Sequence, residues 1–202
     1  PLEAATLTTA GLTAWRALVV NGGLKAGDVV LTLGSGGVSI FALQIAKAMG
    51  ATVIATSSSD EKLARARALG ADLTINAMAG DPAETLKKET GGGAHGVLIT
   101  APSLPAFKQG VAMTRKTGTC VLVGLPPGEF PVPLFGVVAD CITIRGSFVG
   151  NRKDMAEALA FAAAGKVKAD IELQPLSAIN EVFDRLEHGK VAGRVVLDFA
   201  TA

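Results

Sequence analysis

Three glycines lie between a strand-like segment and a helix-like segment in the first quarter of this 202-residue chain. Gly34, Gly36 and Gly37 follow the apolar run at 29–33, and an apolar-periodic segment continues from Ile40. A strand, a glycine turn and a helix place unpaired backbone N–H groups, and the positive end of the helix dipole, where phosphate groups can bind. This pattern predicts a cradle for the pyrophosphate of a dinucleotide.

The glycine motif departs from the usual dinucleotide fingerprint at its last position, where Ser39 replaces the third glycine. Such a motif is informative only when a strand precedes it, a helix follows it and a second strand comes next. The β-branched run after Gly50 supplies that second strand. We therefore favour a dinucleotide site, with a glycine turn that binds no ligand as the alternative.

Alternating strand and helix patterns surround this motif. Six short apolar runs have the composition of buried strands, at 29–33, 52–55, 73–76, 96–99, 119–124 and 142–146. Amphipathic segments such as 60–69 and 104–113 lie between them and predict crossover helices. Strands that alternate with helices indicate a parallel sheet covered on both faces. The predicted fold class is α/β, a Rossmann-type doubly wound parallel sheet of six strands with flanking helices.

The two ends of the chain do not belong to this nucleotide-binding pattern. Their predicted elements are helices at 4–20, 152–164 and 177–187 and a terminal strand at 194–199. The predicted division of the chain is a linking helix at 1–23, a dinucleotide-binding Rossmann domain at 24–150, and C-terminal helices and a strand at 151–202. The last segment has the pattern of a remnant of a second domain.

The composition excludes several classes of protein. Hydrophobic residues make up 49% of the chain, enough for a substantial core, and the formal net charge is only +1. The chain has no basic stripe for nucleic acid, no apolar run of the ~20 residues that a bilayer requires, and no signal-peptide pattern. We expect a cytoplasmic protein with small-molecule partners, no nucleic acid and no membrane.

The cysteines and histidines do not have the spacing of metal ligands. Cys120 and Cys141 lie in apolar runs, which predicts buried thiols rather than a disulfide framework. His95 and His188 are far from both cysteines in sequence, and the pattern assigns neither a partner acid or nucleophile for a catalytic role. We expect no zinc to be bound by this chain alone.

Several motifs resemble the medium-chain dehydrogenase/reductase superfamily, which includes zinc alcohol dehydrogenases and zinc-free quinone oxidoreductases. They are the segments 4–18, 25–31, 69–72, 123–127, 145–147 and 193–196, together with the glycine loop. The resemblance covers essentially the whole chain. It implies an NAD(P)-dependent enzyme that transfers hydride between a nicotinamide cofactor and a carbonyl, an alcohol or a quinone.

Members of that superfamily normally begin with a separate catalytic domain that carries most of the zinc ligands, and we expect none of it in this sequence. Thr9 stands where alcohol dehydrogenases usually have a cysteine that binds zinc, and threonine is a poor zinc ligand. The chain is therefore expected to be a cofactor-binding domain with little or no activity of its own. The alternative function is an isolated binding module without turnover.

The resemblance also implies roles for individual residues. Gly34, Gly36 and Gly37 would cradle the pyrophosphate, and Val38 would pack behind the nicotinamide ring. The residues implied at the carboxamide end of the cofactor are Thr13 and, through backbone groups, Val123, Ser147 and Val149. Arg194 matches an arginine that reaches the pyrophosphate, a role that suits the fork of a guanidinium group. A solvated charge at the start of a strand is the alternative for Arg194.

The end of the second strand bears on the choice between NADP and NAD. NAD-specific members of the superfamily have an aspartate there, whereas this chain has Ser57. A hydroxyl can donate a hydrogen bond to a 2′-phosphate, which an acid would repel, and Lys62 is close in sequence. We expect NADP, with NAD as the alternative. Asp60, the competing candidate for the ribose, is assigned to a helix N-terminus.

Two further expectations concern partners. A methyltransferase-type site for S-adenosylmethionine is disfavoured because such sites commonly have an acid at the strand end, where this chain has hydroxyls. The resemblance implies a homodimer that pairs through the last sheet strand at 142–146, an apolar segment that would otherwise form a solvated edge.

Overall fold

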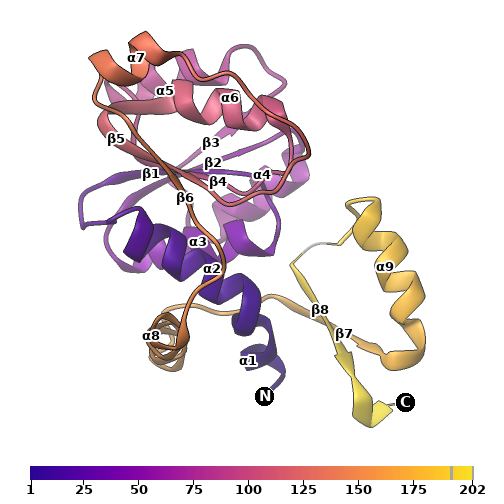
Figure 1. Ribbon diagram of the computed structural model, residues 1–202. Helices are drawn as coiled ribbons and strands as arrows, with labels where there is room; N and C mark the ends of the chain where they lie inside the picture. The colour runs from indigo at the N-terminus through magenta and orange to yellow at the C-terminus, as the bar shows by residue number, and fades with distance from the viewer. Residues whose placement is uncertain (192, 202) are drawn as a thin grey trace.

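Six parallel strands form the central sheet of the computed structural model, which describes residues 1–191 and 193–201 (Figure 1). The strands are β1 (Val29–Leu33), β2 (Thr52–Ser57), β3 (Leu73–Asn76), β4 (Ala94–Ile99), β5 (Thr114–Leu122) and β6 (Thr143–Gly146). Their order across the sheet is β3-β2-β1-β4-β5-β6. The strand order reverses between β1 and β4, which confirms the predicted Rossmann-type fold.

The predicted strands agree with the observed ones to within two residues, except at the start of β5. This strand begins at Thr114 and not at residue 119, because its first residues pair with the start of β4 beyond a shift in register between Ala94 and Gly96. An irregular pairing of this kind has no local sequence signal.

Both faces of the sheet are covered by helices. The helices between the strands are α3 (Gly37–Ala48), α4 (Asp60–Ala68), α5 (Pro82–Thr90), α6 (Leu104–Met113) and α7 (Leu134–Ala139). Figure 1 shows α5 and α6 on one face and α2 and α3 on the other. Val30 of β1 packs in the core on the α3 side, whereas its neighbour Leu31 packs in the core with α6. Because successive strand residues point to opposite, buried faces, β1 at the centre of the sheet is almost entirely apolar, whereas the edge strand β6 is largely exposed.

One continuous helix precedes the sheet, as predicted for 4–20. Its segments are α1 (Leu2–Thr6), η1 (Leu7–Gly11), α2 (Leu12–Trp15) and η2 (Arg16–Asn21), of which the second and fourth are π-helical. Ala14 and Leu18 are buried in the core that α3 shares. The π-helical turns widen the helix where it passes the sheet, and such turns often accompany functional sites.

The C-terminal elements separate into a helix beside the N-terminal helix, at 152–163, and a smaller unit to one side of the sheet, at 171–187 and 194–198 (Figure 1). They are α8 (Arg152–Ala163), β7 (Ile171–Pro175), η3 (Leu176–Ala178), α9 (Ile179–Glu187), β8 (Arg194–Asp198) and η4 (Phe199–Thr201). The predicted helices and terminal strand are confirmed, and β8 pairs in parallel with β7, a strand absent from the prediction. The division of the chain at residues 23/24 and 150/151 stays a prediction.

One of the two cysteines does not lie where its sequence context predicts. Cys120 of β5 is fully buried, as expected, but Cys141 is exposed. Cys141 has a φ of +51° and precedes β6 in a turn, so the apolar run that follows it does not carry it into the core. Within residues 1–191 and 193–201, no helix is both long and apolar enough to cross a membrane.

Candidate functional site

The turn after β1 has a backbone shape that only glycine adopts easily. Gly34 has a φ of +123°, and a Cβ atom there would lie 2.3 Å from Thr100 Oγ1. Gly36 is the N-cap of α3, and among the described residues no side chain accepts a hydrogen bond at that cap. A Cβ on Gly36 would meet open space. The first backbone N–H groups of α3 are therefore free to bind an anion.

Ser39, at the position of the third glycine, is integrated into this turn by its hydroxyl group. Ser39 Oγ lies 2.6 Å from Thr100 Oγ1, and the Thr100 hydroxyl donates to the Leu33 carbonyl at 3.0 Å. Since the Thr100 proton is directed to Leu33, Ser39 is the donor between the two hydroxyls. The serine thus keeps the close approach of α3 to the sheet and adds a hydrogen bond between α3 and the residue that follows β4.

Arg194, the first residue of β8, lies across the glycine turn. A Cβ atom on Gly37 would be 2.6 Å from Arg194 Cδ and 2.9 Å from its Nη1, so the arginine packs directly on this glycine. Arg194 Nε is buried and has no hydrogen-bond partner in the part of the chain that the structure describes. A buried guanidinium N–H without an acceptor is costly. An anionic oxygen at the start of α3 would satisfy it.

One cleft of about 530 Å³ at the carboxyl ends of the strands is lined by the glycine turn, Thr100 and Arg194, but not by Ser39. The predicted residues that line it are Gly34, Gly36, Gly37, Val38, Ser57 and Arg194. The cleft opens between β1 and β4, where the strand order reverses, which is where open α/β sheets bind ligands. It is large enough for a dinucleotide-sized ligand to enter.

The remaining predicted residues lie elsewhere. Val123 and Ser147 line a second hollow, of about 460 Å³, at the ends of β5 and β6. Lys62 lines a smaller hollow of about 120 Å³ with Ser35 and Lys190. Neither Thr13, which is buried in α2, nor Val149 lines any of these three cavities.

Many residues that line the main cleft are absent from the predicted set, and Thr100, Met78 and Gln109 are three of them. Thr100 directly follows β4 at the strand reversal, so the rule that ligands bind at carboxyl ends of strands could have indicated it. Met78 and Gln109 reach the cleft from the loop after β3 and from α6. No local motif distinguishes these two residues.

Ser57 and Asp60 have different surroundings at the end of β2. Ser57 Oγ accepts a hydrogen bond from the Ser59 N–H at 3.2 Å and faces the cleft. Asp60 accepts a hydrogen bond from Asn76 Nδ2 at 2.7 Å in the first turn of α4. Ser57, and not Asp60, lines the cleft.

Titratable groups are scarce at the site. The cleft is lined by no His, Cys, Asp, Glu or Lys among the described residues. His95 instead contacts the Val29 N–H and Arg115 at the other end of β1, and His188 is exposed at the end of α9. Burial raises the pKa of the Cys120 thiol to about 12, partly opposed by a hydrogen bond with Thr114, so this thiol is inert.

The described residues do not fit a zinc ion. Across 1–191 and 193–201 there is no group of three or more His, Cys, Asp or Glu side chains that could hold a metal. Thr9 is exposed on the N-terminal helix. Zinc binding by this chain alone would need ligands that these residues do not supply.

A parallel six-stranded sheet with a cleft at its strand reversal and an open helix N-terminus defines a Rossmann-type nucleotide-binding domain. Residues 37–164 match the profile of a protein family described as zinc-binding dehydrogenase. This match covers more than half of the chain. The chain belongs to that family, within the medium-chain dehydrogenase/reductase superfamily.

Individual relatives are alcohol dehydrogenases. Over 98% of its length the chain is 50% identical to an alcohol dehydrogenase of Moraxella sp. (strain TAE123), of which it spans 58%. It matches the crystal structure of an alcohol dehydrogenase from Aeropyrum pernix with a TM-score of 0.89 and 35% identity, over 96% of this chain and 57% of that one. An NAD-dependent alcohol dehydrogenase gives a TM-score of 0.90 and 35% identity, over 98% and 58%. The chain therefore spans a little over half the length of these relatives.

Proposed function

We propose that this chain is the cofactor-binding part of a hydride-transfer dehydrogenase and binds a nicotinamide dinucleotide in the main cleft. The observation that carries the proposal is the buried, unpartnered Nε of Arg194 above Gly37. The amides at the start of α3 and the Arg194 guanidinium would hold the pyrophosphate. The bound nicotinamide ring would supply the hydride chemistry, while the protein orients it.

The same proposal assigns the other predicted residues to the two ends of the cofactor. Val38 would pack behind the nicotinamide ring, since it lines the cleft next to the glycine turn. Backbone groups of Val123, Ser147 and Val149 would meet the carboxamide, with Thr13 approaching from the N-terminal helix. Ser57 would meet the ribose of the adenosine half.

NADP is the proposed form of the cofactor. Ser57 offers a hydroxyl where an acid would repel a 2′-phosphate. The adjacent small hollow is lined by Lys62, Lys190 and Arg65, of which Arg65 forms an ion pair with Asp170. The two lysines outnumber Glu61, the one acid in this lining, which favours a phosphate there. NAD is the second candidate, because one of the similar structures is an NAD-dependent enzyme.

The proposed substrate of the whole enzyme is an alcohol or its carbonyl, in keeping with the names of the relatives, and a quinone is the alternative. Among the described residues, the cleft lining contains no His, Cys, Asp, Glu or Lys side chain. For this reason we propose that the chain alone binds the cofactor with little or no turnover. Cytoplasmic localisation and a homodimer formed through β6 complete the proposal.

Calorimetric titration of the chain with NADPH and NADH tests the proposal. We expect saturable binding, and Arg194→Ala should weaken it about tenfold or more, because a charge-assisted hydrogen bond is lost. Arg67→Ala is the matched control, since Arg67 is an exposed arginine of α4 that lines none of the cavities.

The proposal is overturned if the folded chain shows neither heat nor thermal stabilisation with any nicotinamide nucleotide. Binding of S-adenosylmethionine alone would replace it with a methyltransferase-type function. Appreciable carbonyl reduction by the chain alone would contradict the expected lack of turnover.

A further inference from the structure

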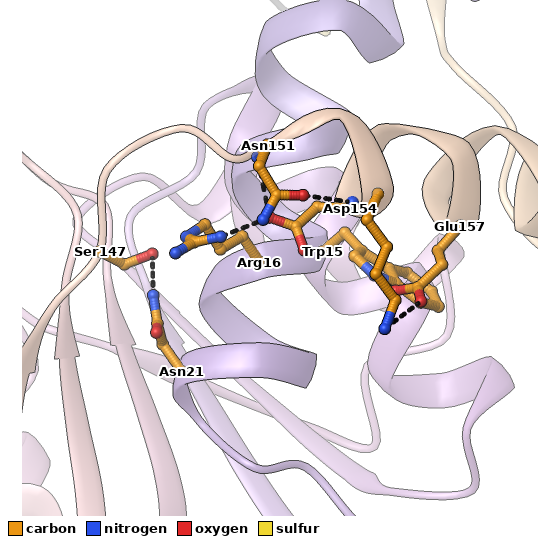
Figure 2. A network of polar contacts seen from close by, with 8 residues as sticks. Trp15, Arg16, Asn21, Ser147, Asn151, Asp154 and Glu157 are labelled. Atoms are coloured by element: carbon orange, nitrogen blue, oxygen red, sulfur yellow. Dashed lines mark hydrogen bonds and ion pairs between the residues drawn. The ribbon is translucent and has the colours of Figure 1, made fainter.

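The segment that joins β6 to α8, residues 147–151, is held by the N-terminal helix. Figure 2 shows side chains of that helix directed toward both ends of the segment. Asn21 Nδ2 donates a hydrogen bond to Ser147 Oγ at 2.8 Å. At the other end, Arg16 Nη1 lies 2.5 Å from Asp154 Oδ2. Arg16 and Asn21, both in η2, thus hold the two ends of the segment that contains Ser147 and Val149.

Asp154 connects this ion pair to the backbone of the segment. Its side chain is only 4% exposed, and its Oδ2 also accepts the Asn151 N–H at 2.9 Å. The Asn151 side chain in turn accepts the Asp154 N–H at 3.0 Å and caps α8. Burial opposes ionisation, but the hydrogen bonds from Asn151 and Arg16 outweigh it and hold the pKa of Asp154 below its usual value. One carboxylate therefore fixes the start of α8 to the N-terminal helix.

The segment itself is held in a conformation that it would not adopt freely. Val149 has a φ of +40°, in the left-handed region that β-branched residues avoid. A Cβ atom on the next residue, Gly150, would lie 2.4 Å from Leu12 Cδ1. Backbone strain of this kind persists only where the surroundings impose it, and it is frequent at ligand sites.

The backbone of Ser147 is also tied to the sheet. Its N–H donates to the Leu122 carbonyl at 2.9 Å, which continues the pairing of β5 with β6. Backbone groups of Ser147 and Val149 are the ones that we assign to a carboxamide. A carboxamide needs one acceptor and one donor at set positions, so a small movement of the segment would disturb both contacts.

We propose that Arg16, Asp154 and Asn21 are positioning residues that hold the backbone of Ser147 and Val149 in register for the nicotinamide carboxamide. This inference rests on the proposed function, because it concerns one end of the same cofactor. The three residues touch neither the pyrophosphate turn nor the adenosine end. Their effect should therefore be confined to ligands that carry the nicotinamide ring.

The test compares two ligands that differ only in that ring, NADPH and 2′-phospho-ADP-ribose, or NADH and ADP-ribose if the chain prefers NAD. We expect Asn21→Ala and Asp154→Asn to weaken binding of the complete cofactor about tenfold. Binding of the ring-less analogue should stay within about twofold of the unchanged chain. Arg16→Lys, which keeps the charge, should retain part of the affinity that Arg16→Met loses.

Glu157→Gln is the matched control. Glu157 accepts a hydrogen bond from Trp15 Nε1 at 3.0 Å and so joins the same two helices without touching the 147–151 segment (Figure 2). We expect it to leave both affinities unchanged. Unfolding temperatures of all variants show which of them are folded. If Asp154→Asn does not fold, Asn21→Ala provides the test instead.

Equal loss of affinity for both ligands, or no loss for either, overturns the positioning role. So does a loss in Glu157→Gln as large as in Asp154→Asn, because the effect would then belong to helix docking. If the unchanged chain binds neither ligand, the proposed function fails and this inference fails with it. If the unchanged chain binds the ring-less analogue, the cleft accepts the adenosine and pyrophosphate groups. A failure of the positioning role can therefore be distinguished from a failure of the proposed function.

Discussion

Each glycine of the turn after β1 meets a different physical requirement. Gly34 needs both its positive φ and the space next to Thr100, whereas Gly36 has a φ of −82° and faces open space. Gly37 provides the surface on which Arg194 lies. Side chains are therefore excluded at Gly34 by the fold and at Gly37 by the arginine. The space beside Gly36 is left for the proposed ligand.

The paired variants Gly34→Ala and Gly36→Ala separate these requirements. Gly34→Ala should lower the free energy of unfolding by about 1–3 kcal/mol, because it combines backbone strain with a steric clash. Gly36→Ala should change it by less than about 0.5 kcal/mol while reducing nucleotide binding. Urea unfolding and calorimetric titration measure the two effects. Equal stability of the two variants would contradict this account.

Ser57 governs the proposed preference for NADP. An aspartate at this position would repel a 2′-phosphate and could accept hydrogen bonds from a free ribose. Ser57→Asp should therefore shift the ratio of NADPH to NADH affinity by about tenfold or more toward NADH. Because both cofactors are titrated into the same variant, a general loss of binding cancels from the ratio. An unchanged ratio would exclude Ser57 from cofactor selection.

At the scale of elements, buried polar contacts between α2, η2 and α8 decide how the ends of the chain meet the sheet. The Arg16–Asp154 pair and the Asn151 cap lie beside an aromatic contact between Trp15 and Phe161, whose ring centroids are 5.2 Å apart. Apolar packing holds the helices together, and the ion pair sets their relative position. Removing one partner of such a pair leaves the other charge buried.

Asp154 should make the stability of the chain depend on pH. Its folded-state pKa is below the ordinary value of 3.8, so the stability it contributes is present above that value and is lost as the pH falls below it. Asp154→Asn should cost roughly 2 kcal/mol at pH 7. This difference from the unchanged chain should shrink below about pH 4. Urea unfolding from pH 7 to pH 3 measures it, and a constant difference would refute the assignment.

At the scale of the whole molecule, several apolar side chains remain exposed. Phe135 of α7 is 88% exposed and Phe148 is 77% exposed, both near β6 at the edge of the sheet. Phe183 of α9 is 60% exposed on the smaller unit. Apolar patches rimmed by polar residues often mark association surfaces. The positions near β6 agree with the proposal that β6 pairs with a second copy of the chain.

Sedimentation of the chain tests the proposed dimer. Pairing through β6 should give a particle of twice 20.5 kDa that persists on dilution to low micromolar concentration. Phe183→Asp, on the smaller unit, should leave that mass unchanged. A mass of 20.5 kDa at working concentration would contradict pairing through β6.

The sequence by itself determined the fold class and most of the elements, but not β7 or the start of β5. Strand and helix patterns report which side chains a segment buries, and burial of a strand or helix face is a local, periodic property. For this reason the six strands, the helix at 4–20 and the glycine turn at 34–37 could all be predicted. The candidate cleft followed from the same turn, since its amides come from consecutive residues.

Only the tertiary structure decided which distant residues meet. Arg194 reaches Gly37, Asp154 reaches Arg16, and Thr100 closes on Ser39 because strands and helices pack in a particular order. Cys141 lies in a turn despite its apolar neighbours, and β7 forms because β8 is beside it. Contacts of this kind depend on the complementary shapes of packed surfaces, which a local periodicity does not encode.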